Sequence, residues 1–111
     1  MAYEIFKSDK SGKFYFRLKA KNNQVILASE AYNTKKNAEN GISSVKKHAS
    51  AMKNFETKEA KDGRTYFVLK AKNGEVIGTS QMYKSRSGLR NGMNSVNTNC
   101  KSTVKDMTVA K

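Results

Sequence analysis

The chain has 111 residues, and a hydrophobic content of 37% suffices for one small domain with a modest core. Its 22 Lys and Arg residues outnumber its 9 Asp and Glu residues, so the formal net charge of +13 creates a field that favours polyanions such as nucleic acid or acidic proteins. The only cysteine, Cys100, excludes an internal disulfide, and no Cys/His cluster is available for a metal, so we expect no metal and no cofactor.

The first segment of the chain, MAYEIFKSDK, has neither the pattern of a secretion signal nor an apolar run of membrane-spanning length. We therefore expect a cytoplasmic protein that makes no contact with a membrane. Residues 3–7 are expected to form a first strand, which a turn at Gly12 joins to the next one.

The next segment, FYFRLKA, places the apolar residues of 14–20 on one side of an extended chain, which is the period of a half-buried strand. The dipeptide Asn22-Asn23 accepts positive φ and predicts a two-residue type I′ turn. With that turn, Leu18 faces Leu27 on the inward side of a hairpin. Ile26 then points outward, away from the core.

Beyond Tyr32 the hydrophobic period changes to that of a helix. The apolar residues are spaced by four, three and four positions, and Thr34 precedes them as a hydroxyl N-cap. These residues are Ala38, Ile42, Val45 and Ala49.

The same pattern occurs a second time, 51 residues later and without a gap. Residues 16–26, FRLKAKNNQVI, match residues 67–77, FVLKAKNGEVI, and the turn dipeptide becomes Asn73-Gly74. Ser85 replaces Thr34 as N-cap, and a weaker first strand is expected at residues 55–59. The second helix repeats the apolar spacing with Leu89, Met93, Val96 and Cys100, and residues 104–109 add a short final strand.

Each repeat is therefore β-β-β-α, with boundaries at 1–51 and 52–111. A unit of about 50 residues buries too little surface to be stable alone. We predict one α+β domain over residues 1–111, in which tandem repeats share an antiparallel sheet with two helices on one face and a pseudo-twofold axis. Because this arrangement already supplies an internal dimer, we expect a monomer.

The repeated motif F-x-L-K-A-x-N-G-x-V-I, followed by S-x-x-Y and by a helix carrying N-G-[IM]-x-S-V, resembles the YegP-like domain of bacterial and archaeal proteins. The resemblance covers nearly the whole chain. It implies a tandem fold in which strands of both repeats combine into a shared sheet, and it implies a family without assigned activity. Asn23 stands where the family pattern has glycine, and asparagine also adopts positive φ.

The sheet face opposite the apolar one is the first candidate site. Rings that stack on bases, beside cations that contact phosphates, suit single-stranded nucleic acid. An ordinary solvent-exposed face of a lysine-rich sheet has the same composition, and the outward isoleucines also suit a protein contact. The candidate residues are Tyr15, Arg17, Lys19, Lys21 and Ile26 in the first repeat and Tyr66, Lys70, Lys72 and Ile77 in the second.

The entry of each helix is the second candidate site. Basic residues stand in first turns, where the helix dipole disfavours cations, and an anion bound to the free amides would reconcile them. A lysine-rich composition explains the same residues, and packing at the edge of the core explains the tyrosines. The candidates are Ser29, Tyr32, Lys35 and Lys36, with Ser80, Tyr83, Lys84 and Arg86.

Gly41 and Gly92 interrupt the two helices at matching positions, so we expect each helix to approach the sheet closely there. Catalytic residues are not indicated. His48 is the only histidine, and near a helix end it is interpreted as a favourable charge. In the gap-free register no acidic residue meets another acidic residue, so no duplicated acid-base site can be built, and we predict that the protein is not an enzyme.

These observations predict a small, basic, non-enzymatic binding or accessory module whose partner is nucleic acid or another polyanion. Two alternatives remain open. One is a protein–protein interaction or stress-related scaffold that uses an exposed sheet edge and whose basicity is incidental. The other is a small-anion binder or enzyme at the helix entries.

Overall fold

The computed structural model describes residues 2–20 and 22–108, and each repeat in it consists of three strands followed by a helix. The first repeat contains β1 (Ala2–Lys7), β2 (Phe14–Lys19), β3 (Val25–Ser29) and α1 (Lys35–His48). A 3₁₀ turn, η1 (Met52–Asn54), leads to the second repeat, with β4 (Phe55–Glu59), β5 (Thr65–Lys70), β6 (Val76–Thr79) and α2 (Arg86–Asn99). The strand β7 (Val104–Asp106) follows α2.

Within these residues, the strands form one seven-stranded sheet in the order β4-β5-β6-β3-β2-β1-β7. The third strands of the two repeats pair antiparallel at its centre, where Ala28 faces Thr79. This confirms the shared sheet and its pseudo-twofold arrangement. One detail differs from the predicted antiparallel sheet, because β7 pairs with β1 in parallel. The chain leaves α2 beside the start of β1 and then runs in the same direction as β1.

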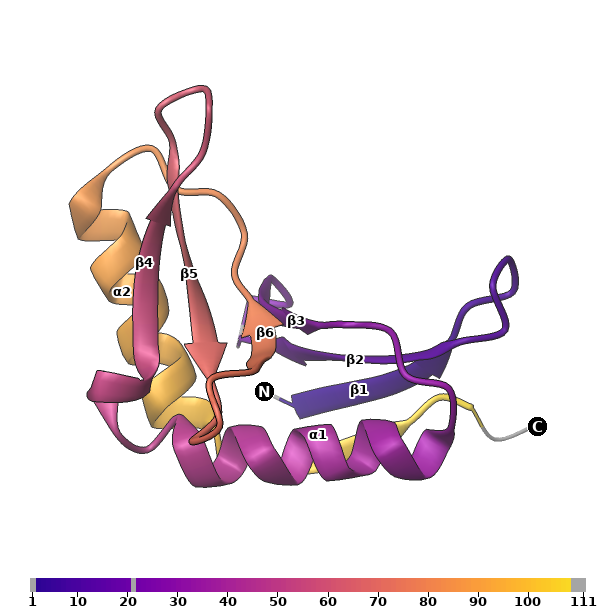
Figure 1. The fold of residues 1–111 in the computed structure, drawn as a ribbon. Helices are drawn as coiled ribbons and strands as arrows, with labels where there is room; N and C mark the ends of the chain where they lie inside the picture. The colour runs from indigo at the N-terminus through magenta and orange to yellow at the C-terminus, as the bar shows by residue number, and fades with distance from the viewer. Residues whose placement is uncertain (1, 21, 109–111) are drawn as a thin grey trace.

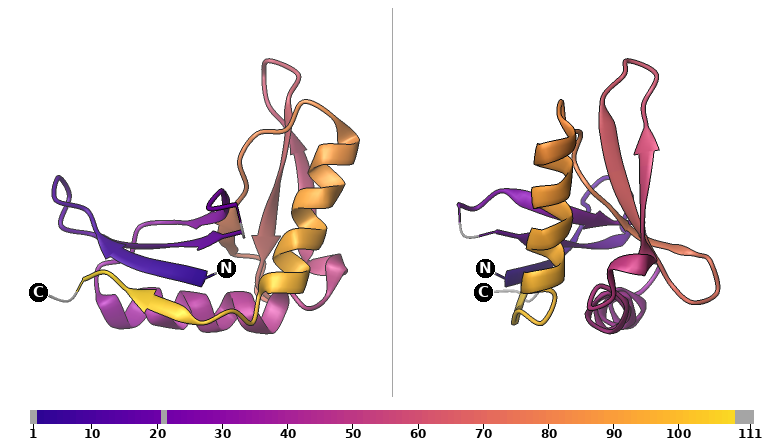
Figure 2. Two further views of the ribbon diagram at one scale, coloured as in Figure 1. Left: turned by 180° about the vertical axis from the view of Figure 1, so that it is seen from behind. Right: turned by 90° about the vertical axis from the view of Figure 1, so that its left-hand side faces the viewer.

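Both helices cover the same face of the sheet (Figure 1). The half formed by β4 and β5 stands steeply against the half formed by β1 and β2, and the two further views show the same bend (Figure 2). The helices lie on the outside of the bend. The opposite face of the sheet is therefore concave, and it is the face on which the sequence places Tyr15 and Tyr66.

The core lies between the sheet and the helices, and its residues follow the predicted periods. The predicted N-caps are confirmed, since the hydroxyl oxygens of Thr34 and Ser85 accept hydrogen bonds from the amides of Asn37 and Gly88. Cys100 is buried, as expected for a small apolar residue. The fully buried large side chains are Tyr3, Ile5, Phe16, Leu18, Leu27, Val45, Phe67, Leu69 and Val96.

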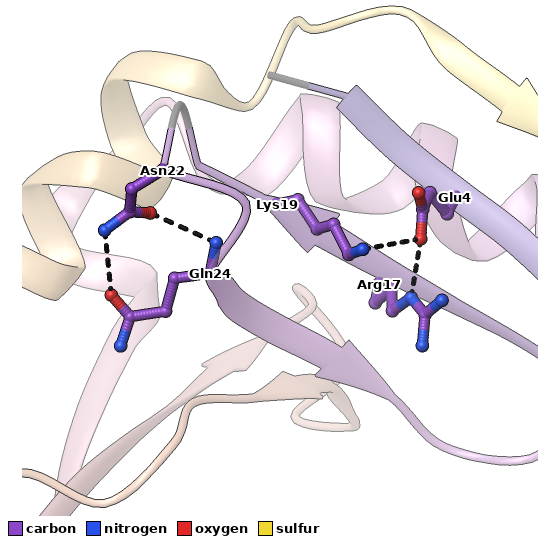
Figure 3. Close-up of polar contacts among 5 residues, drawn as sticks. All are labelled: Glu4, Arg17, Lys19, Asn22 and Gln24. Atoms are coloured by element: carbon purple, nitrogen blue, oxygen red, sulfur yellow. Dashed lines mark hydrogen bonds and ion pairs between the residues drawn. The ribbon is translucent and has the colours of Figure 1, made fainter.

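The hairpin turns differ from the predicted two-residue type I′ turns, which need positive φ at both central residues. In each dipeptide only the second residue has positive φ, namely Asn23 (φ 68°) in the first hairpin and Gly74 (φ 87°) in the second. Their amides donate to Ala20 and Ala71, so each turn begins before the dipeptide and closes with a left-handed residue. In the first turn, Asn22 Oδ1 accepts from the Gln24 amide (Figure 3).

This longer turn produces a bulge that overturns the expected orientation of Ile26 and Ile77. Leu18 faces Leu27 as predicted, but Lys19 faces Val25, so Ile26 is left out of the alternation. The second hairpin has the same irregularity at Lys70. As a result, Ile26 and Ile77 are only 4% and 5% exposed and belong to the core instead of an interaction face.

The end of each hairpin packs against the helix of the other repeat. Ile26 lines a depression with Gly92 of α2, and Ile77 lines one with Gly41 of α1. The turn of the second hairpin is also tied to α1, because the Lys72 amide donates to His48 Nε2 at 3.2 Å. His48 Nδ1 lies 2.8 Å from the Ser44 carbonyl oxygen, so this residue at the end of α1 joins its own helix to the hairpin of the other repeat, a contact that the sequence interpretation did not include.

Two further hydrogen bonds join the repeats near the ends of the helices. The Tyr3 hydroxyl donates to the Cys100 carbonyl at 2.6 Å, and the Asn97 amide group donates to the Ala49 carbonyl at 2.7 Å. The core is therefore shared between the repeats, and neither repeat encloses a core of its own.

The expected close approach at the helix glycines is confirmed. A Cβ atom on Gly41 would overlap the Tyr32 hydroxyl, and one on Gly92 would overlap that of Tyr83. The two tyrosine rings stack on Phe16 and Phe67, with centroids 6.1 and 6.2 Å apart. Each glycine thus makes room for a tyrosine between helix and sheet.

The strand β7 is held by an ion pair whose pH dependence can be measured. Hydrogen bonds from Lys35 and Thr108 lower the pKa of Asp106 to about 2. Because this pKa lies below the usual value for an unfolded chain, near 3.9, the stabilisation is complete above that value and is lost as the pH falls through about 2. We expect the Asp106 carboxyl to titrate near pH 2 by NMR, and the amide of Met107, bonded to Ile5, to lose protection with it. Titration near pH 4 would contradict this pairing.

Candidate functional site

The concave face of the sheet carries one row of residues across six strands. The pairings join Glu4, Arg17, Ala28, Thr79, Val68 and Glu56 in that order. Small or apolar residues occupy the middle of the row, and an acidic residue stands at each end. The predicted candidates Arg17, Lys19 and Lys70 lie beside these two acidic residues.

Glu4 binds the basic residues of the first repeat. Its Oε1 atom lies 2.7 Å from Arg17 Nε and 3.4 Å from Lys19 Nζ (Figure 3). Burial alone would raise the pKa of Glu4, but the hydrogen bonds from Arg17 and Lys19 outweigh it, and the pKa is held below its usual value. Both cations are thus partly neutralised on the face that was predicted to contact phosphates.

Glu56 has the same role in the second repeat. Its Oε2 atom lies 2.8 Å from Lys70 Nζ and 3.1 Å from Lys58 Nζ, and these contacts lower its pKa. Glu56 faces Val68 as Glu4 faces Arg17, so the two glutamates are equivalent. The inference that no acidic residue is matched is therefore wrong. The loop after the first strand is one residue shorter in the second repeat (residues 60–64 against 8–13), which shifts β1 and β4 out of the 51-residue register.

An aromatic pair that the sequence interpretation missed lies beside this row. The rings of Phe6 and Tyr15 stack with centroids 5.7 Å apart, and the Arg17 guanidinium lies 4.5 Å from the Phe6 centroid. Phe6 alternates with Glu4 on β1, so the period of the strand could have placed it on this face. In the second repeat, Lys58 takes the place of Phe6 and faces Tyr66.

The remaining candidates of this face do not join the cluster. The Lys72 amide is bonded to His48 at the hairpin turn, and Lys21 lies outside the described residues. Ile26 and Ile77 are buried on the other side of the sheet. The candidate site therefore consists of Tyr15, Arg17 and Lys19 with Phe6 in the first repeat, and of Tyr66 and Lys70 in the second.

The helix entries do not gather their candidate residues around an anion site. The hydroxyls of Ser29 and Ser80 accept from the amides of Phe16 and Phe67 and donate to the carbonyls of Glu30 and Gln81, so they complete the sheet. Lys35 is paired with Asp106. Lys36, Lys84 and Arg86 are exposed, and the tyrosines lie under the glycines farther along each helix.

Two structural findings bear on cofactors and membranes. Within residues 2–20 and 22–108, no three His, Cys, Asp or Glu side chains gather closely enough to hold a metal ion. Neither helix of the described part of the chain combines the length and the apolar character needed to span a bilayer.

A duplicated β-β-β-α unit with one shared sheet and a shared core defines a tandem-repeat α+β module. The chain belongs to the family described as a domain of unknown function, DUF1508, whose pattern matches residues 9–56 and again residues 60–106. The UPF0339 protein YegP of Yersinia pestis is 47% identical, over 96% of this chain and 96% of that protein.

Two solution NMR structures have the same fold. The UPF0339 protein of Shewanella oneidensis is 45% identical, with a TM-score of 0.90 over 96% of this chain and 91% of that one. The protein yegP of E. coli is 41% identical, with a TM-score of 0.91 over 99% of this chain and 95% of that one. The expected resemblance to YegP-like domains is thereby confirmed.

Proposed function

We propose that the protein is a small, non-enzymatic, cytoplasmic and monomeric module that binds single-stranded nucleic acid on the concave face of its sheet. The observation that carries this proposal is the stacked pair of Phe6 and Tyr15 beside the Arg17 guanidinium. Bases stack on aromatic rings without regard to sequence, while guanidinium and ammonium groups contact the phosphates.

The charge of the chain supports the same partner class. A net charge of +13 on 111 residues raises the local concentration of polyanions around the whole molecule. The glutamates at the ends of the central row set a limit on this attraction, because Glu4 and Glu56 hold Arg17, Lys19 and Lys70 in ion pairs. Binding of phosphates then requires these pairs to open or to share their cations.

Two substitutions on this face are expected to change affinity in opposite directions. Tyr15→Ala removes a stacking ring and should weaken binding of a fluorescent oligothymidine about tenfold, since base stacking contributes about 1–3 kcal/mol per base. Glu4→Gln removes the carboxylate that competes for Arg17 and Lys19, and it should strengthen binding about threefold. Fluorescence anisotropy at several salt concentrations measures both effects.

Lys47→Gln is the matched control, because Lys47 is exposed on α1, away from the concave face. It should lower the affinity only slightly, through the net charge. Binding that is insensitive to salt, or equal affinity of the Tyr15→Ala and Glu4→Gln variants, would refute the proposed site.

A further inference from the structure

The outer strands of the two repeats, β1 and β4, have different neighbours. The outer edge of β1 is paired with β7, whereas β4 ends the sheet and has no strand on its outer side among residues 2–20 and 22–108. Figure 1 shows β4 beside β5 and in front of α2, and Figure 2 shows β7 running along α1. An exposed strand edge offers unpaired backbone groups to another strand.

The first repeat shows how such an edge is filled. The Tyr3 amide donates to the Thr103 carbonyl at 2.9 Å, and the Met107 amide donates to the Ile5 carbonyl at 2.8 Å. Asp106 extends toward α1 and pairs with Lys35 in the first turn of that helix. The addition of a strand to a repeat therefore requires a free strand edge and a basic residue at the start of the neighbouring helix.

The second repeat has both requirements. Thr57 corresponds to Ile5, since these residues face the equivalent Phe67 and Phe16, so its backbone groups also point away from the sheet. Arg86 corresponds to Lys35. A groove between β4 and α2 is lined by Thr57, Lys58, Glu59, Thr65, Arg86, Leu89, Arg90 and Met93.

The floor of this groove is less covered than its counterpart. Ile42 of α1 is 3% exposed, whereas the equivalent Met93 of α2 is half-buried. The Phe55 amide is already bonded to the Met52 carbonyl, so an added strand would begin its backbone pairing at Thr57.

The charge of the open groove indicates what it would accept. The next turn of α1 places the acidic Glu39 after Lys35, whereas the next turn of α2 places Arg90 after Arg86. Both arginines are exposed and line the groove. The first groove thus holds β7, which offers a single aspartate to Lys35. The second groove offers two arginines and therefore suits a more acidic strand.

We propose that the open edge of β4 accepts an extended acidic segment of a partner protein as a parallel strand, with two carboxylates, two residues apart, that pair with Arg86 and Arg90. The alternation of a strand places residues i and i+2 on the same face, toward α2. This surface lies at the other end of the sheet from Phe6 and Tyr15. Its two arginines belong to α2, on the face that the helices cover, whereas the proposed nucleic-acid site lies on the concave face.

The test uses a peptide built on the strand that fills the first groove. A fluorescein-labelled peptide of residues 101–108, carrying Val104→Glu and Lys105→Thr, presents one carboxylate at position 104 and one at Asp106. We expect saturable binding by anisotropy, and NMR shifts in the amides of β4 and the first turn of α2. A peptide with both carboxylates replaced by amides should bind about tenfold more weakly, because it cannot form the two exposed ion pairs with Arg86 and Arg90.

Variants of the protein separate the contribution of the ion pairs from the contribution of backbone pairing to this binding. Arg86→Gln with Arg90→Gln should weaken binding of the acidic peptide about tenfold, whereas Lys10→Gln with Lys47→Gln removes the same charge elsewhere and should leave it nearly unchanged. Thr57→Pro removes the outward amide, which an edge strand tolerates, and should abolish binding.

Several results would overturn the proposal. The amide peptide could bind as tightly as the acidic peptide, or the acidic peptide could shift only amides outside β4 and α2. The double arginine variant could also bind the acidic peptide with full affinity. Concentration-dependent shifts of β4 without peptide, together with a dimer by sedimentation, would assign the edge to a second copy of the chain. An oligothymidine that shifts the groove amides more than the peptide does would assign the groove to nucleic acid.

Discussion

Gly92→Ala, which adds a single methyl group, is expected to cost about 2–3 kcal/mol of the free energy of unfolding. The added Cβ would overlap the Tyr83 hydroxyl and would lie 2.6 Å from Cζ of the same ring. Tyr83 cannot move away freely, because its ring stacks on the fully buried Phe67. Gly41→Ala meets Tyr32 and Phe16 in the same way and should cost as much. Urea denaturation followed by circular dichroism measures both values.

Gly88→Ala is the matched control on the same helix. Its Cβ would meet Ser85 Oγ at 3.3 Å and Tyr83 Cδ1 at 3.4 Å, tight contacts that a shift of a few tenths of an ångström in those side chains relieves. The intrinsic preference of alanine for helices, about 0.5–1 kcal/mol, offsets this shift, so Gly88→Ala should change stability by less than about 1 kcal/mol. If Gly92→Ala behaved like Gly88→Ala, the tyrosine would not fill the space under the helix as described.

Separation of the repeats is expected to have the larger effect, namely complete loss of fold in each half. A fragment of residues 1–51 loses α2, against which its hairpin packs, and it loses the Cys100 carbonyl that accepts from buried Tyr3. A fragment of residues 52–111 loses α1 and leaves β7 without β1. Each fragment should give the NMR spectrum of an unfolded chain.

Mixing supplies the control for this experiment. Equal amounts of the two fragments should recover the dispersed spectrum of the intact chain, because the contacts between repeats need no covalent link. A dispersed spectrum from either fragment alone would show that one repeat encloses its own core, and it would contradict the arrangement described above.

The elements of this fold could be predicted from the sequence because their periods are strong. Alternation placed Phe16 and Leu18 in the core, helical spacing placed Ile42 and Val45 there, and hydroxyl residues marked where the helices begin. The burial of Ile26 could not be predicted from alternation, because a bulge shifts the register by one residue. That bulge depends on a turn whose length the dipeptide Asn22-Asn23 does not determine.

The candidate site could be predicted only in part. Tyr15, Arg17 and Lys19 lie on the predicted face, but the ion pairs of Arg17 and Lys19 are made with Glu4 of β1, which lies outside the repeated motif. The equivalence of Glu4 and Glu56 was hidden by the one-residue difference in the preceding loops, which a gap-free comparison cannot detect. The open edge of β4 depends on the position of β7, and only the pairing of strands reveals it.

The central claim, that the concave face binds single-stranded nucleic acid, is tested most directly by NMR titration of the ¹⁵N-labelled protein with an oligothymidine of about ten nucleotides. The account predicts amide shifts concentrated on β1 and β2 around Phe6, Tyr15 and Arg17, with a salt dependence that indicates contact with several phosphates. Shifts confined to the helix entries or to the groove beside β4, or no shifts near physiological salt, would contradict it.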